Sequence, residues 1–166
     1  MDYFECIQKR FSCRSFKEEK VSKEILEGVL QAGLLAPTAC NYQPERIVVV
    51  EDPSIIERLK EATRYTFNAK TILIVCHDKN ESWHRGNDGV DHGIVDSTIV
   101  ATQMVLALTS LGLASCYVCS FKEKLAREIL GLSDHLHIDI MLPIGYPKEV
   151  LPHNKRKDLD SIVIYK

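Results

Sequence analysis

The sequence predicts one domain in which helices and strands alternate, either an α+β fold or a three-layer α/β sandwich. Its 166 residues are enough to bury one core of ordinary size. Hydrophobic residues make up 45% and charged residues 27% of the chain, the balance of a globular domain. Segments with helical and with strand patterning follow one another without a repeat or a break in composition, so residues 1–166 are expected to form a single domain.

Five segments carry helix signals. Asp2 and Ser22 are candidate N-caps of helices that end near Lys9 and before Pro37. Pro53 suits the first turn of a helix that runs through Arg64. The two remaining helices are expected at 93–111, with a glycine just beyond the end, and at 122–130.

Strand signals lie between these helices. β-Branched and apolar residues predict buried strands at 46–50 and 71–76, and further strands at 115–120 and 137–144. A short strand is expected at 162–165. The polar, glycine-containing stretch from 78 to 92 is expected to be a surface loop.

The predicted helix at 93–111 is apolar on nearly every side. Such a helix must be buried over most of its surface, and one small sheet cannot cover it. We therefore expect a homodimer in which a second subunit covers part of this helix. The strand at 162–165 is a candidate to pair with the sheet of the partner.

Charge and targeting signals restrict the classes of partner. A net charge of -2 gives no reason to expect nucleic acid or an anionic membrane as a partner. No apolar run approaches the length of a membrane span, and no signal peptide is visible at the start of the sequence. The six cysteines are then expected to be reduced thiols in a cytoplasmic protein.

Basic residues alternate near the N-terminus. Arg10, Ser12 and Arg14 stand at every second position, so in an extended segment they project to the same side. Two guanidiniums and a hydroxyl on one side form an anion receptor, because the guanidinium fork matches phosphate oxygens. Taken alone, such a pattern is more often a solvated basic stretch.

A second candidate segment spans 36–44. Small residues there would let a flat ring lie against the backbone, and Asn41 and Gln43 offer amide groups to the edge of a heteroaromatic ring. The alternative is a helix-to-strand connection whose prolines and asparagine merely suit a turn.

Taken together, the motifs resemble those of the FMN-dependent nitroreductase family. Members open with a helix and R-R-S-x-R-x-F, continue with A-P-S-x-x-N-x-Q-P and L-G-L-G-S-C-W-I-G-A-F, and end with P-x-G-Y-P and a basic R-K-P-L-like segment. The corresponding segments here, in the same order, are Arg10-Phe-Ser-Cys-Arg-Ser-Phe16, Ala36-Pro-Thr-Ala-Cys-Asn-Tyr-Gln-Pro44, Leu111-Gly-Leu-Ala-Ser-Cys-Tyr-Val-Cys-Ser-Phe121, Leu142-Pro-Ile-Gly-Tyr-Pro147 and Arg156-Lys-Asp-Leu159.

This resemblance implies a nitroreductase-like three-layer sandwich, with a central mixed sheet flanked by helices, that forms a homodimer with FMN at the subunit interface. It implies that Arg10, Ser12 and Arg156 hold the phosphate with help from Lys157, and that Arg14 lies near the isoalloxazine ring. The other subunit would supply Pro37, Thr38, Ala39 and Asn41, and the backbone around Tyr117, Cys119 and Ser120 would face the ring from the opposite side.

The chain departs from the family pattern at several of these positions. Phe11, included among the candidate cofactor-binding residues, stands where a second arginine is usual. Tyr117 replaces tryptophan and Cys119 replaces glycine beside the expected ring, and Asp158 replaces proline in the basic segment. These changes leave the preferred substrate open.

The implied activity is an oxidoreductase that uses NADH or NADPH to reduce small planar acceptors, of the nitroaromatic or quinone type, by a ping-pong hydride mechanism. The alternative is an FMN-binding or flavin-processing protein of the same fold without nitroreductase turnover. A protein–protein adaptor would leave Arg10, Arg14 and Arg156 unexplained as a set.

Other residue clusters offer weaker signals. Cys116 and Cys119 have C-x-x-C spacing but lie in a predicted strand, where residues three apart point to opposite faces, so they are expected to be ordinary thiols. The two histidine pairs, His84 with His92 and His135 with His137, lack a recognisable ligand pattern, and no metal site is expected. No nucleophile–base pair is apparent either, so the flavin is expected to carry the chemistry.

Overall fold

The computed structural model describes residues 1–152 and 155–166, and within them it has an α+β fold. One four-stranded sheet has the order β1–β2–β4–β3. Its strands are β1 (Glu45–Val50), β2 (Thr71–Asp78), β3 (Ala114–Ser115) and β4 (Leu136–Gly145). All neighbouring strands pair antiparallel. The expected mixed sheet is therefore antiparallel in its named strands, and parallel pairing in the described chain is confined to an isolated bridge between Ser12 and Ser115.

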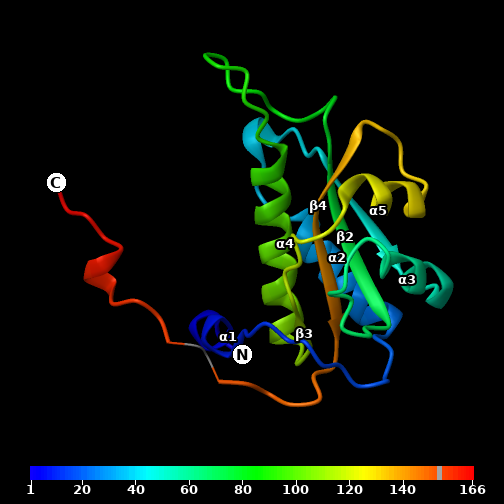
Figure 1. Cartoon of the computed structure of the whole chain (residues 1–166). Helices are drawn as coiled ribbons and strands as arrows, with labels where there is room; N and C mark the ends of the chain where they lie inside the picture. The colour runs from blue at the N-terminus through cyan, green and yellow to red at the C-terminus, as the bar shows by residue number, and fades with distance from the viewer. Residues whose placement is uncertain (153–154) are drawn as a thin grey trace.

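Helices cover both faces of the sheet (Figure 1). One face carries α2 (Lys23–Leu34) and α4 (Gly93–Ser110), which pack on each other. The other carries α3 (Pro53–Leu59) and α5 (Glu123–Leu130). The short α1 (Tyr3–Lys9) lies against α4. This arrangement confirms the predicted sandwich of helix, sheet and helix.

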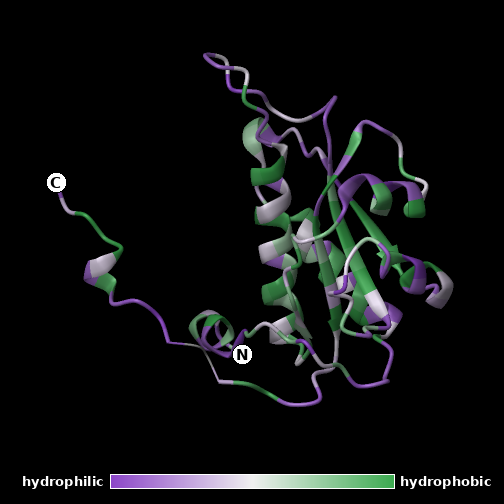
Figure 2. Cartoon of the chain, in the orientation of Figure 1, coloured by the Kyte–Doolittle hydropathy of each residue, from purple (hydrophilic) through white to green (hydrophobic). Residues whose placement is uncertain are grey.

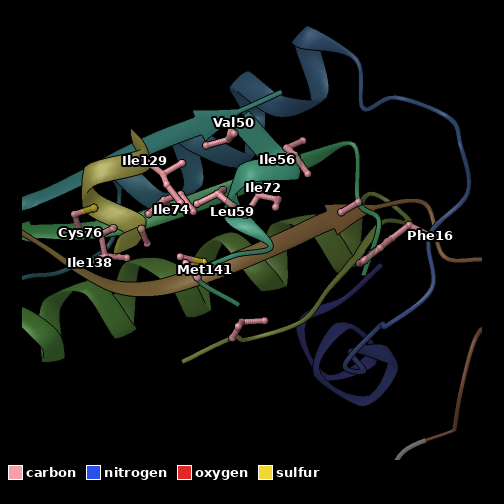
Figure 3. Packing of buried hydrophobic residues seen from close by; sticks show 14 of the residues in the cluster. Phe16, Val50, Ile56, Leu59, Ile72, Ile74, Cys76, Ile129, Ile138 and Met141 are labelled. Atoms are coloured by element: carbon pink, nitrogen blue, oxygen red, sulfur yellow. The ribbon is translucent and has the colours of Figure 1, made fainter. Parts of the chain in front are cut away.

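Two hydrophobic clusters fill the space between the layers. On β2, Ile72 and Ile74 belong to the cluster under α3 and α5, whereas Leu73 and Val75 belong to the cluster under α2 and α4. Figure 3 shows the first of these clusters, in which Leu59 and Ile129 from the helices meet the sheet. Figure 2 shows the corresponding hydrophobic strands at the centre of the molecule. The continuous apolar run in β2 is thus explained by burial on both of its faces.

A β-bulge changes the alternation on β4. Ile138 and Met141 both contact the α3/α5 cluster although they are three residues apart, whereas Ile140 and Leu142 contact the α2/α4 cluster. The register between β2 and β4 shifts at the same place, opposite Val75 and Cys76. One extra residue in the ladder is enough to reverse which face each side chain takes.

The helix ends agree with the predicted caps. The carboxylate of Asp2 accepts a hydrogen bond from the backbone N–H of Glu5, and the hydroxyl of Ser22 accepts one from that of Ile25. Gly112 follows α4 with φ of 79°, the left-handed conformation expected just past a helix. α3 ends at Leu59 rather than at Arg64, and turns take over from there.

Two predicted strands differ from the structure. The strand expected at 115–120 is reduced to β3 and a single bridge between Val118 and Met141. Residues 162–165 form no strand in this chain; they follow the short 3-10 helix η2 (Leu159–Ser161) in a tail that lies apart from the rest of the chain (Figure 1). A β-branched segment forms a strand only where another strand offers hydrogen bonds, and none lies beside this tail.

The α4 helix is long and apolar enough to span a membrane by length and composition alone. The sequence suggested no such segment. Half of the helix is buried inside the fold, where it packs on β2, β4 and α2. It is therefore placed as the core helix of this domain.

Candidate functional site

The N-terminal basic segment is extended and is held against β3. The backbone N–H of Cys13 donates to the carbonyl of Ser115 at 2.9 Å. Cys13 is buried in the α3/α5 cluster, and Phe11 packs against the same cluster. Because alternate side chains of an extended segment point in opposite directions, Arg10, Ser12 and Arg14 project away from the core. The predicted alternation is confirmed, and the side chain of Phe11 lies on the core side.

Arg14 borders a cavity of about 280 Å³ together with three other predicted site residues. These are Tyr117, Cys119 and Ser120, which follow β3. The carbonyl of Ser120 accepts a hydrogen bond from the hydroxyl of Thr63 at 2.8 Å, which fixes the far end of this segment to the stretch that follows α3. The remaining lining residues are Tyr65, Phe67, Cys116 and Val118.

The charge beside this cavity is positive. Neither Arg10 nor Arg14 forms an ion pair within residues 1–152 and 155–166. Burial raises the pKa of the Cys116 thiol, and the charges of Arg14 and Arg10 partly oppose that rise. Two guanidiniums without carboxylate partners on one side of a fixed segment suit a phosphate or another anion.

Tyr117 separates this cavity from a second one of about 360 Å³, which it also lines with Cys119. The hydroxyl groups of Tyr117 and Thr102 lie 2.7 Å apart, so the ring is fastened to α4. Cys119 is exposed and Cys116 is buried, as expected for residues three apart in an extended segment. The two thiols are unpaired, and nothing in their placement favours a redox dithiol.

The loop at 37–43 includes the short 3-10 helix η1 (Ala39–Asn41) and is held in place by side chains. The hydroxyl of Thr38 accepts a hydrogen bond from the backbone N–H of Gln43 at 3.1 Å. The backbone N–H of Ala39 donates to the carboxylate of Asp96 on α4 at 2.9 Å. Cys40, Asn41 and Gln43 have positive φ, an unusual run for residues other than glycine. Such strain persists only where the surroundings enforce it, and it is common at binding sites.

Sequence reasoning missed Asp96, which is almost fully buried. One carboxylate oxygen holds Ala39, and the other has no hydrogen-bond partner among the described residues. The available signal was an acidic residue in the first turn of an apolar helix that was expected to be buried. Carboxylates are rarely buried unless they are hydrogen-bonded or ion-paired to a neighbouring group.

The predicted site residues form two separate groups in one chain. Ala39 lies beside Asp96 at the start of α4, whereas the thiol of Cys6, just before the basic segment, contacts the carbonyl of Leu106 near its end. Asp96 and Leu106 are ten residues apart on α4, which is roughly 15 Å at about 1.5 Å per residue. Arg156 and Lys157 are exposed residues of the C-terminal tail, and neither lines the cavity beside Arg14. One chain therefore does not bring the 13 predicted residues together.

A cluster that no sequence motif indicated lies at one end of the sheet. The carboxylate of Asp139 contacts two imidazoles, with Nδ1 of His77 at 2.8 Å and Nδ1 of His137 at 3.1 Å. Burial opposes protonation of His77, but Asp139 and Asp91 outweigh it and raise the pKa of this imidazole. His137 was considered only with His135 in the sequence, because the pairing of β2 with β4 cannot be read from spacing along the chain.

Known proteins resemble this chain over most of its length. The family model described as the Nitroreductase family matches residues 7–70 and 64–146. The chain belongs to the nitroreductase family. The basic segment, the loop at 37–43 and the cavity beside Arg14 all fall within the matched residues.

Individual relatives support this membership. A protein of Archaeoglobus fulgidus, provisionally named as an NADH dehydrogenase/NAD(P)H nitroreductase, is 30% identical over 86% of this chain and 84% of its own length. The crystal structure of a nitroreductase family protein of Clostridium difficile 630 has a TM-score of 0.94 and 37% identity, and covers 100% of this chain and 99% of its own. A structure named as an FMN-dependent nitroreductase of Clostridium difficile R20291 has a TM-score of 0.83 and 27% identity over 96% of both chains.

Proposed function

We propose that this nitroreductase family protein is an FMN-dependent oxidoreductase that uses NADH or NADPH to reduce small planar acceptors of the nitroaromatic or quinone type. The cavity beside Arg14 is the observation that carries the proposal, because it combines a cationic wall with aromatic and small side chains. A flavin phosphate needs cations, and its ring needs a flat, largely apolar surface. The family is generally FMN-dependent, and one structural relative is named as such.

The residues present fit FMN as the cofactor. Arg10, Ser12 and Arg14 project from the core on one side, and their guanidiniums have no acidic partner in the described part of the chain. In the proposal Arg10 and Ser12 hold the phosphate, with Arg156 and Lys157 from a tail, while Arg14 faces the ring. When bound, FMN would accept hydride from the reduced nicotinamide and pass it to the acceptor.

The loop at 37–41 would complete this site from the other subunit of a homodimer. It carries Pro37, Thr38, Ala39 and Asn41, and its contact with α4 at Asp96 lies roughly 15 Å along the helix from that of Cys6 at Leu106, at about 1.5 Å per residue. Two sites related by the symmetry of a dimer would each take one group from each subunit, which resolves the separation. Tyr117, Cys119 and Ser120 would form the wall opposite this loop.

Arg14 has a distinct task in this proposal. Its positive charge beside the cavity favours an anionic ligand and raises the tendency of a bound ring to accept negative charge. The remaining chain supplies position and exclusion of water rather than a nucleophile. One open ring face would stack one planar molecule at a time, which predicts ping-pong kinetics.

The first test measures the affinity of the Arg14→Ala variant for FMN. Binding is monitored through the quenching of the fluorescence of free flavin. Loss of charge-assisted hydrogen bonds worth about 1.5–3 kcal/mol should weaken FMN binding by roughly 10- to 100-fold. Lys17→Ala is the matched control, since it removes a positive charge from the same segment three residues away and does not line the cavity. Equal FMN affinity in Arg14→Ala and the wild type would contradict the assignment of this cavity.

The second test is anaerobic addition of NADH or NADPH to the FMN-loaded protein. Bleaching of the flavin within seconds, and recovery on addition of a quinone or nitroaromatic compound, is the expected result. Bound FMN that neither nicotinamide reduces would favour a flavin-binding or flavin-processing role. One relative is named for a reaction other than nitroreduction: mouse iodotyrosine deiodinase 1 is 24% identical over 98% of this chain and 69% of its own length.

A further inference from the structure

We infer that His77, His137 and Asp139 form a binding site for one divalent transition-metal ion of the zinc class, in addition to the proposed flavin site. Two imidazoles and one carboxylate are a ligand set that suits Zn²⁺. The sequence suggested no metal site, and the proposed flavin chemistry does not use these residues. They come together only through the pairing of two strands.

Strand register places the three ligands on one face of the sheet. His77 on β2 lies directly opposite His137 on β4, and Asp139 follows His137 by two residues. His77 continues the face on which Leu73 and Val75 contact the α2/α4 cluster. The β-bulge lets Asp139 share this face with His137 while Ile140 turns into the same cluster. An apolar sheet face therefore ends in a polar cluster beside the start of α4.

The donor atoms are spaced closely enough for one ion. One ligand atom from each of the three residues can be chosen so that all lie within 4.8 Å of one another. Asp139 lies 2.8 Å from Nδ1 of His77 and 3.1 Å from Nδ1 of His137. Ligands at about 2.1 Å from a tetrahedral ion stand roughly 3.4 Å apart, so both histidine–aspartate contacts are already near ligand spacing, and no pair of the chosen donor atoms has to close from more than 4.8 Å.

A neighbouring carboxylate orients one of the ligands. Nε2 of His77 lies 3.4 Å from the carboxylate of Asp91, which leaves Nδ1 to face Asp139. Metal-bound histidines usually donate their second ring nitrogen to such a carboxylate, which fixes the tautomer and the ring orientation. The rings of His77 and His137 also stack, with centroids 5.3 Å apart. The site therefore contains a carboxylate, Asp91, that orients the ligand His77, in addition to the three ligands themselves.

Burial and charge favour a cation here. The side chain of Asp139 is fully buried and that of His77 is 7% exposed, whereas His137 is 45% exposed and gives access from solvent. Both Asp139 and His137 line the 360 Å³ cavity, and so does Glu123. Asp91 and Asp139 make this end of the sheet acidic, since Glu123 is paired with Arg127, and a buried carboxylate requires a positive partner. The fourth position is open to water through the exposed side of His137.

An ion at this site would fasten the loop at 79–92 to the sheet. Asp91 belongs to that loop and contacts His77, so metal, imidazole and carboxylate would form one continuous connection from β4 to the loop. The loop precedes α4, whose residues Ile94 and Thr98 line the same cavity. The ion therefore stabilises a wall of the cavity next to Tyr117 and Cys119.

Isothermal titration of ZnCl₂ into the chelator-treated, FMN-loaded protein tests this inference. One Zn²⁺ per chain with a micromolar or tighter Kd is expected for the wild type, and native mass spectrometry should show the same count. His137→Ala and Asp139→Asn should each weaken binding at least about 10- to 100-fold, the range seen when groups that build a metal site are lost. A rise in Tm with zinc should accompany binding in the wild type and be lost in both variants.

His135→Ala is the matched control, because His135 is exposed, lies two residues before His137 and has no contact with Asp139. It should bind zinc as the wild type does. Absence of stoichiometric binding by the wild type, or equal binding by His137→Ala, would overturn the inference, and so would loss of binding in His135→Ala alone. If Asp139→Asn fails to fold, His137→Ala still decides, since its side chain is half-exposed. Flavin content is measured in parallel, so the result is independent of the proposed reaction.

Discussion

At the scale of single residues, Gly93 is required by the ring of His77. A Cβ added at position 93 would lie 2.2 Å from Cδ2 and 2.4 Å from Cγ of that imidazole. The ring is buried and held by Asp139, so it cannot move aside without losing its hydrogen bonds. Overpacking of this kind costs about 1–3 kcal/mol, and Gly93→Ala should lower Tm by roughly 5 °C in thermal unfolding.

Gly28→Ala is the matched control for this substitution. Gly28 also lies in a helix, but a Cβ there would meet nothing within 4 Å. Alanine is favoured over glycine inside a helix by about 0.5–1 kcal/mol, so this variant should be as stable as the wild type or more so. Equal effects of the two substitutions would show that the contact with His77 does not determine the choice of glycine.

Cys119 offers a second prediction at this scale. It lines both cavities near Tyr117, but its thiol is unpaired and Cys116 is buried rather than beside it. Because the flavin would carry the redox chemistry, Cys119→Ala should keep turnover within about twofold of the wild type at saturating FMN. Abolished turnover with FMN still bound would show that the thiol takes part in the reaction.

At the scale of elements, α4 positions the loop at 37–43 through Asp96. Removal of this carboxylate leaves the N–H of Ala39 without its acceptor, a loss of about 1–3 kcal/mol. If the loop completes the flavin site, Asp96→Ala should weaken FMN binding about tenfold or more, measured by flavin fluorescence. Asp88→Ala is the control, because Asp88 is an exposed loop aspartate paired with Arg85. Unchanged FMN affinity in Asp96→Ala would show that the loop does not contribute to binding of the cofactor.

Local sequence signals predicted where helices and strands lie better than they predicted which segments contact each other. Asp2 and Ser22 identify helix starts because a cap is a property of adjacent residues. The alternation of Arg10, Ser12 and Arg14 is likewise local. The contact of His77 with Asp139 depends on the register of two strands 62 positions apart and on a bulge, neither of which is encoded by spacing. For the same reason, the predicted strand at 162–165 does not form in the single chain, because β-branched residues favour a strand but do not supply the second strand with which it would pair.

At the scale of the whole molecule, one chain leaves a large apolar surface uncovered. Ile94 and Val95 at the start of α4 and Leu111 just past its end are exposed, and so are Tyr3 and Phe4 on α1. A cavity of about 660 Å³ lies between α1 and α4. Exposed apolar surface of this extent is typical of an interface. The proposed flavin site would also use a second chain, because its loop and its basic segment lie beside different turns of α4.

The dimer should therefore be needed both for assembly and for FMN binding. Sedimentation velocity of the wild type at micromolar concentration should show a dimer, and FMN affinity should fall when the protein is diluted below its dissociation constant. The tail carries Ile164 and Tyr165, which are 83% and 86% exposed in one chain and are available to cover a partner. Deletion of residues 159–166 removes that cover and should raise the dimer dissociation constant at least about tenfold, since the burial of each large apolar side chain contributes about 1.5–3 kcal/mol. A chain lacking only Lys166 should behave as the wild type. A stable, folded monomer of the wild type that binds one FMN at full affinity would refute the two-chain site.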